Sequence, residues 1–335
     1  MKDFFKGKTV LITGGTGFLG RSLVGELLPL GVHSIRVFSR DEVKHHRIQE
    51  EFNNDARIRC LVGDVRDYER LERAMKDANI VIHAAAMKRI DLIEYNVMEA
   101  VKTNVMGTMN VVNACLKNNV EKAVFVSTDK ACSPINSYGA TKMLGEKIFI
   151  ESNYSKGKSK TSFISVRYGN VLESTGSVIP YFVEKIKKCE QIPLTDDRMT
   201  RFIITPKQAV GLIFMALKHG VGGEIFVPKL KSLKVVDLIG VLKKHYSSRA
   251  GVKETGIRPG EKIHEILMNE DECTRAYDLG SAFAVLSQID CYQNVKYAYL
   301  KEKKKVDFSS YCSKDSLVNP GELEKMLLDL KIIGG

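Results

Sequence analysis

The sequence lacks the features that mark an extracellular, metal-binding or membrane protein. Its 335 residues include no tryptophan, and its seven cysteines are scattered, with no Cys-x-x-Cys pair. With no cluster of histidines either, this argues against a disulfide framework or a zinc site. No apolar run approaches the roughly 20 residues that a membrane-spanning helix needs. The first residues lead into a short strand pattern followed by glycines, which is unlike a signal peptide. We therefore expect a cytoplasmic protein with no metal site and no membrane span.

What the sequence has in excess is positive charge. It carries 51 lysines and arginines against 40 acidic residues, a net charge of +11. Such a balance suits nucleic acid, a membrane surface or an anionic small molecule. Nucleic-acid binding is disfavoured, because there is no tryptophan and the cations are spread among acidic residues. We expect a small anionic ligand, and we interpret the basic run Lys301–Lys305 as a solvated face.

The first half of the chain alternates short apolar runs with longer segments of helical spacing. The runs that indicate strands are Thr9–Thr13, Ser34–Phe38, Arg57–Val62, Ile80–Ala84, Ala123–Ser127 and Phe163–Arg167. The segments that indicate helices are Phe18–Leu30, Asp41–Asn53, Tyr68–Lys76, Val97–Asn118 and Tyr138–Ser152. Because the strands are almost wholly apolar, both faces of their sheet should be covered. The alternation predicts an α/β fold with a Rossmann-type, doubly wound parallel sheet.

The pattern changes after about residue 170, where short apolar pieces mix with glycine and proline. A chain of this length is expected to form about two domains. We predict a dinucleotide-binding Rossmann domain over residues 1–170, with some later elements returning to it. Residues 171–335 are predicted to form a smaller, mainly substrate-binding domain.

A glycine-rich loop, Thr13–Gly20, follows the first predicted strand and opens the first long helix. In a dinucleotide fingerprint, Gly14 permits the tight turn, Gly17 lets the backbone approach the pyrophosphate, and Gly20 lets the helix pack on the strand. Unpaired N–H groups and the helix dipole attract the phosphates. The loop predicts dinucleotide binding.

The residues after the second predicted strand bear on which dinucleotide binds. NAD sites usually carry Asp or Glu there, to accept a hydrogen bond from the ribose. This chain has Ser39 and Arg40, which suit a 2′-phosphate. The sequence therefore favours NADP, although Asp41 and Glu42 follow directly and leave NAD open. Asp64, after the third strand, is placed to bond the adenine.

Tyr138 and Lys142 stand one turn apart on one face of a predicted helix. A nearby ammonium and a positive nicotinamide both lower the pKa of a phenol. The phenolate can then take a hydroxyl proton while a hydride leaves the carbon. Ser127 and Thr128 end the preceding strand, which makes the combination more specific than the Tyr-x-x-x-Lys pair alone.

These motifs resemble the extended short-chain dehydrogenase/reductase family over nearly the whole chain. Within that family the sequence is similar to the inverting UDP-N-acetylglucosamine 4,6-dehydratases that begin pseudaminic acid synthesis. The specific matches are Ser127–Ala131 (STDKA) and Gly256–Glu265 (GIRPGEKIHE), whereas the glycine loop and Tyr-x-x-x-Lys are shared with epimerases and reductases. Two positions depart from close relatives: Arg89 replaces a histidine, and Thr175 replaces a basic residue.

The resemblance implies a reaction that needs more than the tyrosine. A 4,6-dehydratase oxidises C4, removes the C5 proton, expels the C6 hydroxyl as water and returns the hydride to C6. The adjacent Asp129 and Lys130 supply two titratable groups for the elimination. Our hypothesis is that Lys130 removes the C5 proton and Asp129 protonates the leaving hydroxyl, with the reverse left open. The implied catalytic residues are Thr128, Asp129, Lys130, Tyr138 and Lys142.

The resemblance also implies the residues that contact ligands. The implied cofactor contacts are Thr13, Gly14, Thr16, Gly17, Phe18, Leu19, Ser39, Arg40, Asp64, Val65, Ala84, Ala85, Ala86, Lys88, Asn104, Tyr138, Lys142 and Tyr168. The implied UDP-N-acetylglucosamine contacts are Lys88, Asn170, Arg201, Arg258 and Glu261. A homo-oligomer is expected from the family. Two alternatives remain, a nucleotide-sugar 4-epimerase and a non-catalytic NADP-binding scaffold protein.

Overall fold

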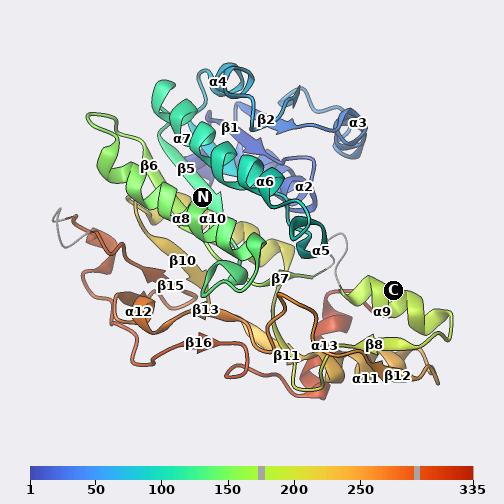
Figure 1. Cartoon of the computed structure of the whole chain (residues 1–335). Helices are drawn as coiled ribbons and strands as arrows, with labels where there is room; N and C mark the ends of the chain where they lie inside the picture. Colours follow the sequence, from blue (N-terminus) through green and yellow to red (C-terminus); the bar gives the residue numbers. More distant parts are fainter. Residues whose placement is uncertain (173–177, 290–294, 335) are drawn as a thin grey trace.

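The computed structural model describes residues 1–172, 178–289 and 295–334, so Thr175 lies outside the described residues. Its main sheet has the strand order β14-β15-β10-β6-β5-β4-β1-β2-β3 (Figure 1). The strands are β1 (Thr9–Thr13), β2 (Ser34–Ser39), β3 (Ile58–Val62), β4 (Ile80–His83), β5 (Lys122–Val126), β6 (Ser162–Val166), β10 (Ile225–Pro228), β14 (Ala276–Asp278) and β15 (Ala282–Val285). The sheet is that of a Rossmann-type α/β fold, as predicted.

The predicted strands pair in parallel, but one edge of the sheet does not. β10 lies parallel to β6, whereas β15 runs antiparallel to both β10 and β14. β14 and β15 are joined by a tight turn through Gly280, which has a positive φ of 92°. A connection this short allows only antiparallel pairing. The predicted doubly wound parallel sheet is confirmed, and the later elements add an antiparallel edge at β15.

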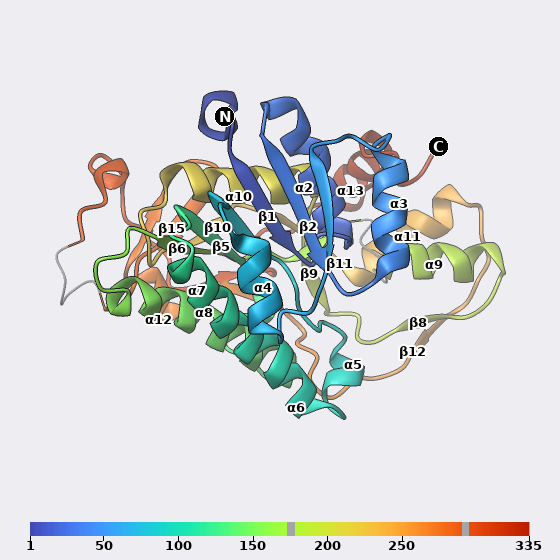
Figure 2. The same ribbon diagram turned by 90° about the horizontal axis from the view of Figure 1, so that it is seen from above.

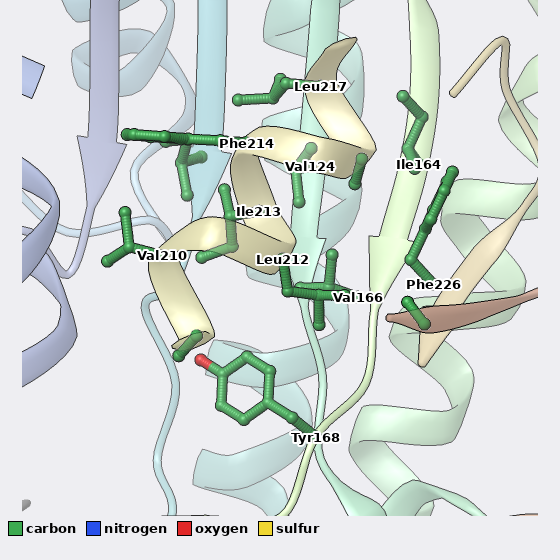
Figure 3. Packing of buried hydrophobic residues seen from close by; sticks show 14 of the residues in the cluster. Val124, Ile164, Val166, Tyr168, Val210, Leu212, Ile213, Phe214, Leu217 and Phe226 are labelled. Carbon is green, nitrogen blue, oxygen red and sulfur yellow. The ribbon is translucent and has the colours of Figure 1, made fainter. Parts of the chain in front are cut away.

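Helices cover both faces of the sheet (Figure 2). α4 (Tyr68–Met75), α7 (Gly107–Lys117) and α8 (Ser137–Ser155) lie on one face, and α2 (Phe18–Leu27) and α10 (Pro206–His219) on the other. Alternate strand residues serve the two layers: Val10 and Ile12 pack in one core, and Leu11 in the other. Figure 3 shows side chains of α10 packed against β5, β6 and β10.

The long helix predicted over 97–118 is interrupted. It consists of α6 (Val97–Ala100), a π-helical segment (Val101–Met106) and α7. Within the π-helical segment, the buried Asn104 accepts a hydrogen bond from Met87 N (2.8 Å) and donates to Met87 O (3.0 Å) and Thr141 Oγ1 (3.0 Å). The interruption thus ties the loop after β4 to α8. Such π-segments occur often at functional sites.

A second, smaller core lies beside the sheet. α9 (Val178–Lys187), α11 (Val235–His245) and α13 (Pro320–Asp329) pack around β8 (Ile192–Leu194), which pairs with β12 (Val252–Glu254). A small sheet of β11 (Lys231–Lys234), β9 (Thr200–Ile204) and β7 (Asn170–Val171) lies between the two cores. α10, β10, β14 and β15 are the later elements that return to the main sheet. The division at residue 170 stays a prediction.

The remaining elements are short. They are α1 (Lys2–Phe5), α3 (Glu42–Glu51), α5 (Ile90–Ile93), β13 (Ile266–Met268), α12 (Glu270–Cys273), β16 (Tyr311–Cys312) and the 3₁₀ turns η1 (Leu28–Leu30), η3 (Asp129–Ala131) and η5 (Ala298–Leu300). Among the described residues, none of these helices or of those above combines the length and apolar character needed to cross a membrane.

Candidate active site

A cavity of about 1550 Å³ opens at the carboxyl ends of the parallel strands. Most of the predicted site residues line it: Gly14, Thr16, Gly17, Phe18, Leu19, Ser39, Arg40, Asp64, Val65, Ala84, Ala85, Ala86, Lys88, Thr128, Lys130, Tyr138, Lys142, Tyr168, Asn170, Arg258 and Glu261. Four predicted residues do not line it: Thr13, Asn104 and Asp129, which are buried, and Arg201, which is partly buried. The carboxyl ends of parallel strands are where open α/β sheets bind ligands.

The glycine loop fits a dinucleotide. Gly14 has a positive φ of 67°, and a Cβ there would lie 2.9 Å from the Ala85 backbone. A Cβ on Gly20 would lie 2.1 Å from Gly15 O, so only glycine allows α2 to begin so close to β1. The N-cap of α2 is Gly17, which has no side chain to cap the helix. The N–H groups of the first turn of α2 are therefore left facing the cavity. These groups form a site for a pyrophosphate.

Thr13 supports this loop from below. Its hydroxyl accepts a hydrogen bond from Ala85 N (3.2 Å) and donates to His83 Nδ1 (2.7 Å). His83 Nε2 in turn donates to Thr108 Oγ1 (3.0 Å), whose own hydroxyl donates to Asn104 O. Burial, reinforced by the charge of Lys142, lowers the pKa of His83 to about 3, so the imidazole is neutral. The contact of Thr13 with a cofactor stays a prediction.

The end of β2 carries more positive charge than the motif alone indicated. Ser39 Oγ lies 2.8 Å from Thr16 Oγ1, and the exposed Arg40 lies 3.8 Å from Asp64. Lys44 and Arg47 of α3 line the same end of the cavity. Lys44 and Arg47 were not among the predicted site residues. They stand three residues apart on α3, and this spacing, which places both on one face of the helix, was the signal in the sequence.

The acid–base groups gather where β5 ends. Thr128 Oγ1 donates to Asp129 Oδ1 (2.8 Å), and Lys130 Nζ lies 3.1 Å from the same oxygen. A Cβ on Gly139 would lie 2.2 Å from Lys130 O, so this glycine lets α8 pack directly on η3. Tyr138 is thereby brought beside Lys130 and Asp129, close enough for both charges to act on its phenol.

The protein groups that act on the pKa of Tyr138 differ in part from those expected. Burial raises the pKa of Tyr138 to about 12, with Lys130 and a hydrogen bond with Thr128 acting against the rise. Lys142 was expected to lower the pKa of this phenol. Its ammonium instead lies 3.8 Å from the centre of the Phe125 ring, and burial lowers its own pKa to about 7. In this structure the cation that favours the phenolate is Lys130.

One buried carboxylate of the site, Glu265, was not among the predicted residues. Glu265, only 2% exposed, has Oε1 3.2 Å from Lys130 Nζ and 3.8 Å from Arg201 Nε. Burial by itself lowers the pKa of Lys130, but Asp129 and Glu265 more than offset this and raise it above its ordinary value. The only signal in the sequence was the place of Glu265 at the end of Gly256–Glu265. Arg201 is turned toward this carboxylate, so its contact with a diphosphate stays a prediction.

The loop that carries the predicted substrate residues is fastened to the start of α8. Asn136 Nδ2 donates to Gly260 O (2.7 Å), and Lys262 Nζ donates to Cys132 O (2.7 Å). Arg258 and Glu261 are thereby held on the cavity wall. They are far from the glycine loop in the sequence but line the same cavity. On another part of the wall, burial lowers the pKa of Lys88.

Comparison with known proteins agrees with this geometry. Residues 10–287 match the family described as "Polysaccharide biosynthesis protein". A Campylobacter jejuni protein named UDP-N-acetylglucosamine 4,6-dehydratase (inverting) is 42% identical, over 97% of this chain and 98% of its own length. A Rickettsia rickettsii protein named UDP-glucose 4-epimerase is 36% identical over 98% of both chains.

A solved structure extends the agreement to three dimensions. The X-ray structure of Pen from Bacillus thuringiensis superposes with a TM-score of 0.92 and 40% sequence identity, covering 98% of this chain and 100% of that one. The chain therefore belongs to the polysaccharide biosynthesis protein family, within the extended short-chain dehydrogenases/reductases.

Proposed function

We propose that the chain is an NADP-dependent UDP-N-acetylglucosamine 4,6-dehydratase that inverts C5. The product is UDP-2-acetamido-2,6-dideoxy-β-L-arabino-hexos-4-ulose, the entry compound of pseudaminic acid or a related surface sugar. The observation that carries the proposal is the Asp129–Lys130 pair beside Tyr138, because a simple oxidation or epimerisation needs no second acid–base pair. The name of the C. jejuni relative supports the same substrate and reaction.

Oxidation at C4 is assigned to the residues of η3 and α8. As the phenolate, the form that the charge of Lys130 favours, Tyr138 takes the proton of the C4 hydroxyl. The Thr128 side chain is in hydrogen-bond contact with the phenol. NADP, when bound, supplies the hydride acceptor at C4 and the hydride donor at C6. Lys142, one turn along α8 and in the same cavity wall, holds the nicotinamide ribose.

The sequence left open which of Asp129 and Lys130 is the acid. For the elimination, the charges around Lys130 favour Lys130 as the acid and Asp129 as the base, the reverse of the hypothesis stated first. Lys130 is an ammonium held by two carboxylates, so it is a proton donor. Asp129 then takes the C5 proton as the C5–H bond electrons form the C5–C6 double bond. The C6–O bond breaks, and the hydroxide leaves as water with the proton of Lys130. The proton that Tyr138 removed from the C4 hydroxyl restores the ammonium of Lys130. Asp129 releases the C5 proton to the solvent, and as the hydride returns to C6 a solvent proton adds to C5 on the opposite face, which balances the reaction and inverts C5.

The choice of NADP is supported by the cations at the end of β2. Arg40, Lys44 and Arg47 line this end of the cavity, where the 2′-phosphate of NADP would lie. Asp41 and Asp64 lie in the same wall, but each is paired with a cation of the chain, Lys44 and Arg66. These ion pairs offset the negative charge of both carboxylates, which lowers their repulsion of a 2′-phosphate.

We also propose a homo-oligomer. Large apolar side chains are exposed along α5, the residues after it, α6 and the π-helical segment: Leu92, Tyr95, Val97, Met98 and Met106. Exposed apolar side chains gathered on neighbouring elements are typical of an interface.

The reaction is tested on the product. UDP-N-acetylglucosamine is incubated with the NADP-loaded protein in heavy water, and the product is examined by mass spectrometry and proton NMR. Loss of one water, deuterium at C5 and the L-arabino configuration are expected, with no net change in NADPH. An isomer of unchanged mass would replace the proposal with a 4-epimerase, which the name of the R. rickettsii relative favours.

The role of the pair is tested with Lys130→Met. Dehydration should fall by about 10²- to 10⁴-fold, the usual contribution of a general acid or base. NADP binding, measured by fluorescence titration, should stay within about twofold because the glycine loop is untouched. Turnover at the wild-type rate would remove Lys130 from the mechanism. NADP binding with no reaction on any nucleotide-sugar would favour the scaffold-protein alternative.

A further inference from the structure

Behind the catalytic lysine lies a carboxylate that does not face the cavity. Lys130 lines the cavity, with about a fifth of its side chain exposed, whereas Glu265 is 2% exposed and is absent from the lining. The two are joined by the 3.2 Å contact between Lys130 Nζ and Glu265 Oε1. Asp129 holds the same ammonium at 3.1 Å. Glu265 therefore reaches the reacting atoms only through Lys130.

Two distant parts of the chain fix the position of Glu265. Its N–H donates to Ser313 Oγ (2.9 Å), and its carbonyl accepts from Ser313 N (2.8 Å). The Ser313 hydroxyl also lies 2.6 Å from Thr200 Oγ1 at the start of β9. The backbone of Glu265 is thus clamped between β9 and the segment that follows β16, so its carboxylate has little freedom to move.

The charged groups around Lys130 depend on one another. The groups that act on its ammonium are Asp129, Glu265, Arg201 and the phenol of Tyr138. Arg201 is itself held by Nη1, which donates to Thr200 O (2.8 Å) and Ile263 O (3.1 Å). Glu265 Oε2 is buried and has no hydrogen-bond partner among the described residues. A buried carboxylate with so few hydrogen bonds is stabilised mainly by nearby cations. Removing one partner of such a cluster lowers the stability of the folded protein.

From this arrangement we propose that Glu265 is a positioning residue, which holds Lys130 Nζ against Asp129 as an ammonium ion for the elimination step. The inference rests on the proposed function, since it assigns Lys130 the proton that leaves with the C6 hydroxyl. Glu265 touches neither substrate nor cofactor. Glu265 determines the position of the proton donor, Lys130, and keeps Lys130 charged when the C4 ketone forms.

The test is Glu265→Gln, which keeps the size of the side chain and removes its charge. We expect kcat to fall by about 10²-fold, the lower end of acid–base contributions, with KM within about threefold. Bound reduced cofactor should accumulate, seen by its absorbance, because C4 oxidation by Tyr138 is intact while elimination is slow. The basic limb of the kcat–pH profile should move to lower pH, because removing a negative charge favours the neutral amine.

A second measurement needs no substrate. An amine acylates only when neutral, so acylation of Lys130 with acetic anhydride, followed by peptide mass spectrometry across pH, reports its protonation. In Glu265→Gln the Lys130 peptide should be modified at least about 10-fold faster at a given pH, one unit of pKa. The buried Lys142 is the internal control, since loss of structure would raise its rate as well.

Two further variants separate positioning from mere structure. Glu265→Asp keeps the charge. Its kcat should be higher than that of Glu265→Gln, and the basic limb of its kcat–pH profile should lie closer to that of the wild type. Glu224→Gln removes another buried carboxylate, bonded to Val221 N, Gly222 N and Tyr299, and should leave the pH profile unchanged. If Glu265→Gln does not fold, a folded Glu265→Asp with wild-type kcat and Lys130 acylation would overturn the proposal.

The outcomes distinguish the two proposals. A wild-type protein that releases no water from UDP-N-acetylglucosamine overturns the proposed function, whatever the Lys130 acylation rates. A folded Glu265→Gln protein with unchanged kcat, pH profile and acylation rate overturns the role of Glu265, even if dehydration is confirmed.

Discussion

At the scale of single residues, the environment of a side chain decides its charge. Tyr138 and Lys142 form the expected pair in sequence, yet burial moves both toward the neutral form, with pKa values of about 12 and about 7. Lys130 is also largely enclosed, but two carboxylates keep it protonated. The same physical cost, burial of a charge, thus has opposite outcomes because only Lys130 has close anionic partners.

Arg40 carries a prediction at this scale. Replacing Arg40 with alanine removes the cation nearest the end of β2, so the affinity for NADP should fall about tenfold, or about 1.4 kcal/mol. The affinity for NAD, which has no 2′-phosphate, should change by less than about threefold. Both are measured by fluorescence titration.

The matched control is Arg73→Ala, an exposed arginine of α4 away from the cavity. It should change neither affinity. Equal weakening of NADP and NAD binding in Arg40→Ala would show that Arg40 does not select between the cofactors.

At the scale of elements, the site depends on how closely α8 approaches η3. A hydrogen at position 139 is all that the Lys130 carbonyl leaves room for. Asn136 caps α8 by accepting from Gly139 N (2.7 Å) and also holds the 258–262 loop through Gly260. The start of one helix therefore sets the positions of Tyr138, Lys130 and the substrate loop together.

Gly139→Ala tests this contact. The new Cβ would lie 2.2 Å from Lys130 O, so α8 or η3 must move. We expect the free energy of unfolding to fall by about 1–3 kcal/mol, as in other overpacked sites, and dehydration to slow more than NADP binding weakens. Chemical denaturation and steady-state kinetics measure the two effects.

Gly211→Ala in α10 is the control, because a Cβ there meets nothing within 4 Å. It should raise the stability by up to about 1 kcal/mol, the helix propensity difference, and leave activity unchanged. Similar effects from the two substitutions would contradict the close contact between α8 and η3.

At the scale of the whole molecule, one buried arginine joins distant parts of the chain. Arg167, after β6, donates to Glu146 of α8 (2.6 Å), to Glu272 of α12 (2.7 Å) and to Leu267 O of β13 (2.8 Å). The guanidinium thereby ties the Rossmann sheet to the segment that also carries Glu265. Burial acts to raise the pKa of Glu272, but Arg167 outweighs it and lowers the pKa from 4.5 to about 2.

The stability should therefore depend on pH in acid. Because the folded pKa of Glu272 lies below the unfolded one, its contribution is present above pH 4.5 and is lost as the pH falls toward 2. A shift of this size corresponds to about 3 kcal/mol, measured by urea denaturation at successive pH values. Arg167→Met should cost about 3–5 kcal/mol at pH 7, because it leaves two carboxylates buried without their cation.

Arg198→Met is the control for the ion pair, since Arg198 is largely exposed beside Asp196. It should cost no more than about 1 kcal/mol. An Arg167→Met protein as stable as Arg198→Met would show that the buried cluster does not hold the two parts together.

The sequence by itself determined the parallel strands and most of the helices of the first half, the glycine loop and the Tyr138–Lys142 pair, because these depend on local periodicity and fixed spacing. Only the tertiary structure decided the antiparallel edge at β15, the π-helical segment around Asn104, and the direction in which Lys142 points. It also decided that Glu265 lies behind Lys130, more than a hundred residues away in the chain. Contacts of this kind follow from how sheet, helix and loop pack together, and no spacing along the chain encodes them.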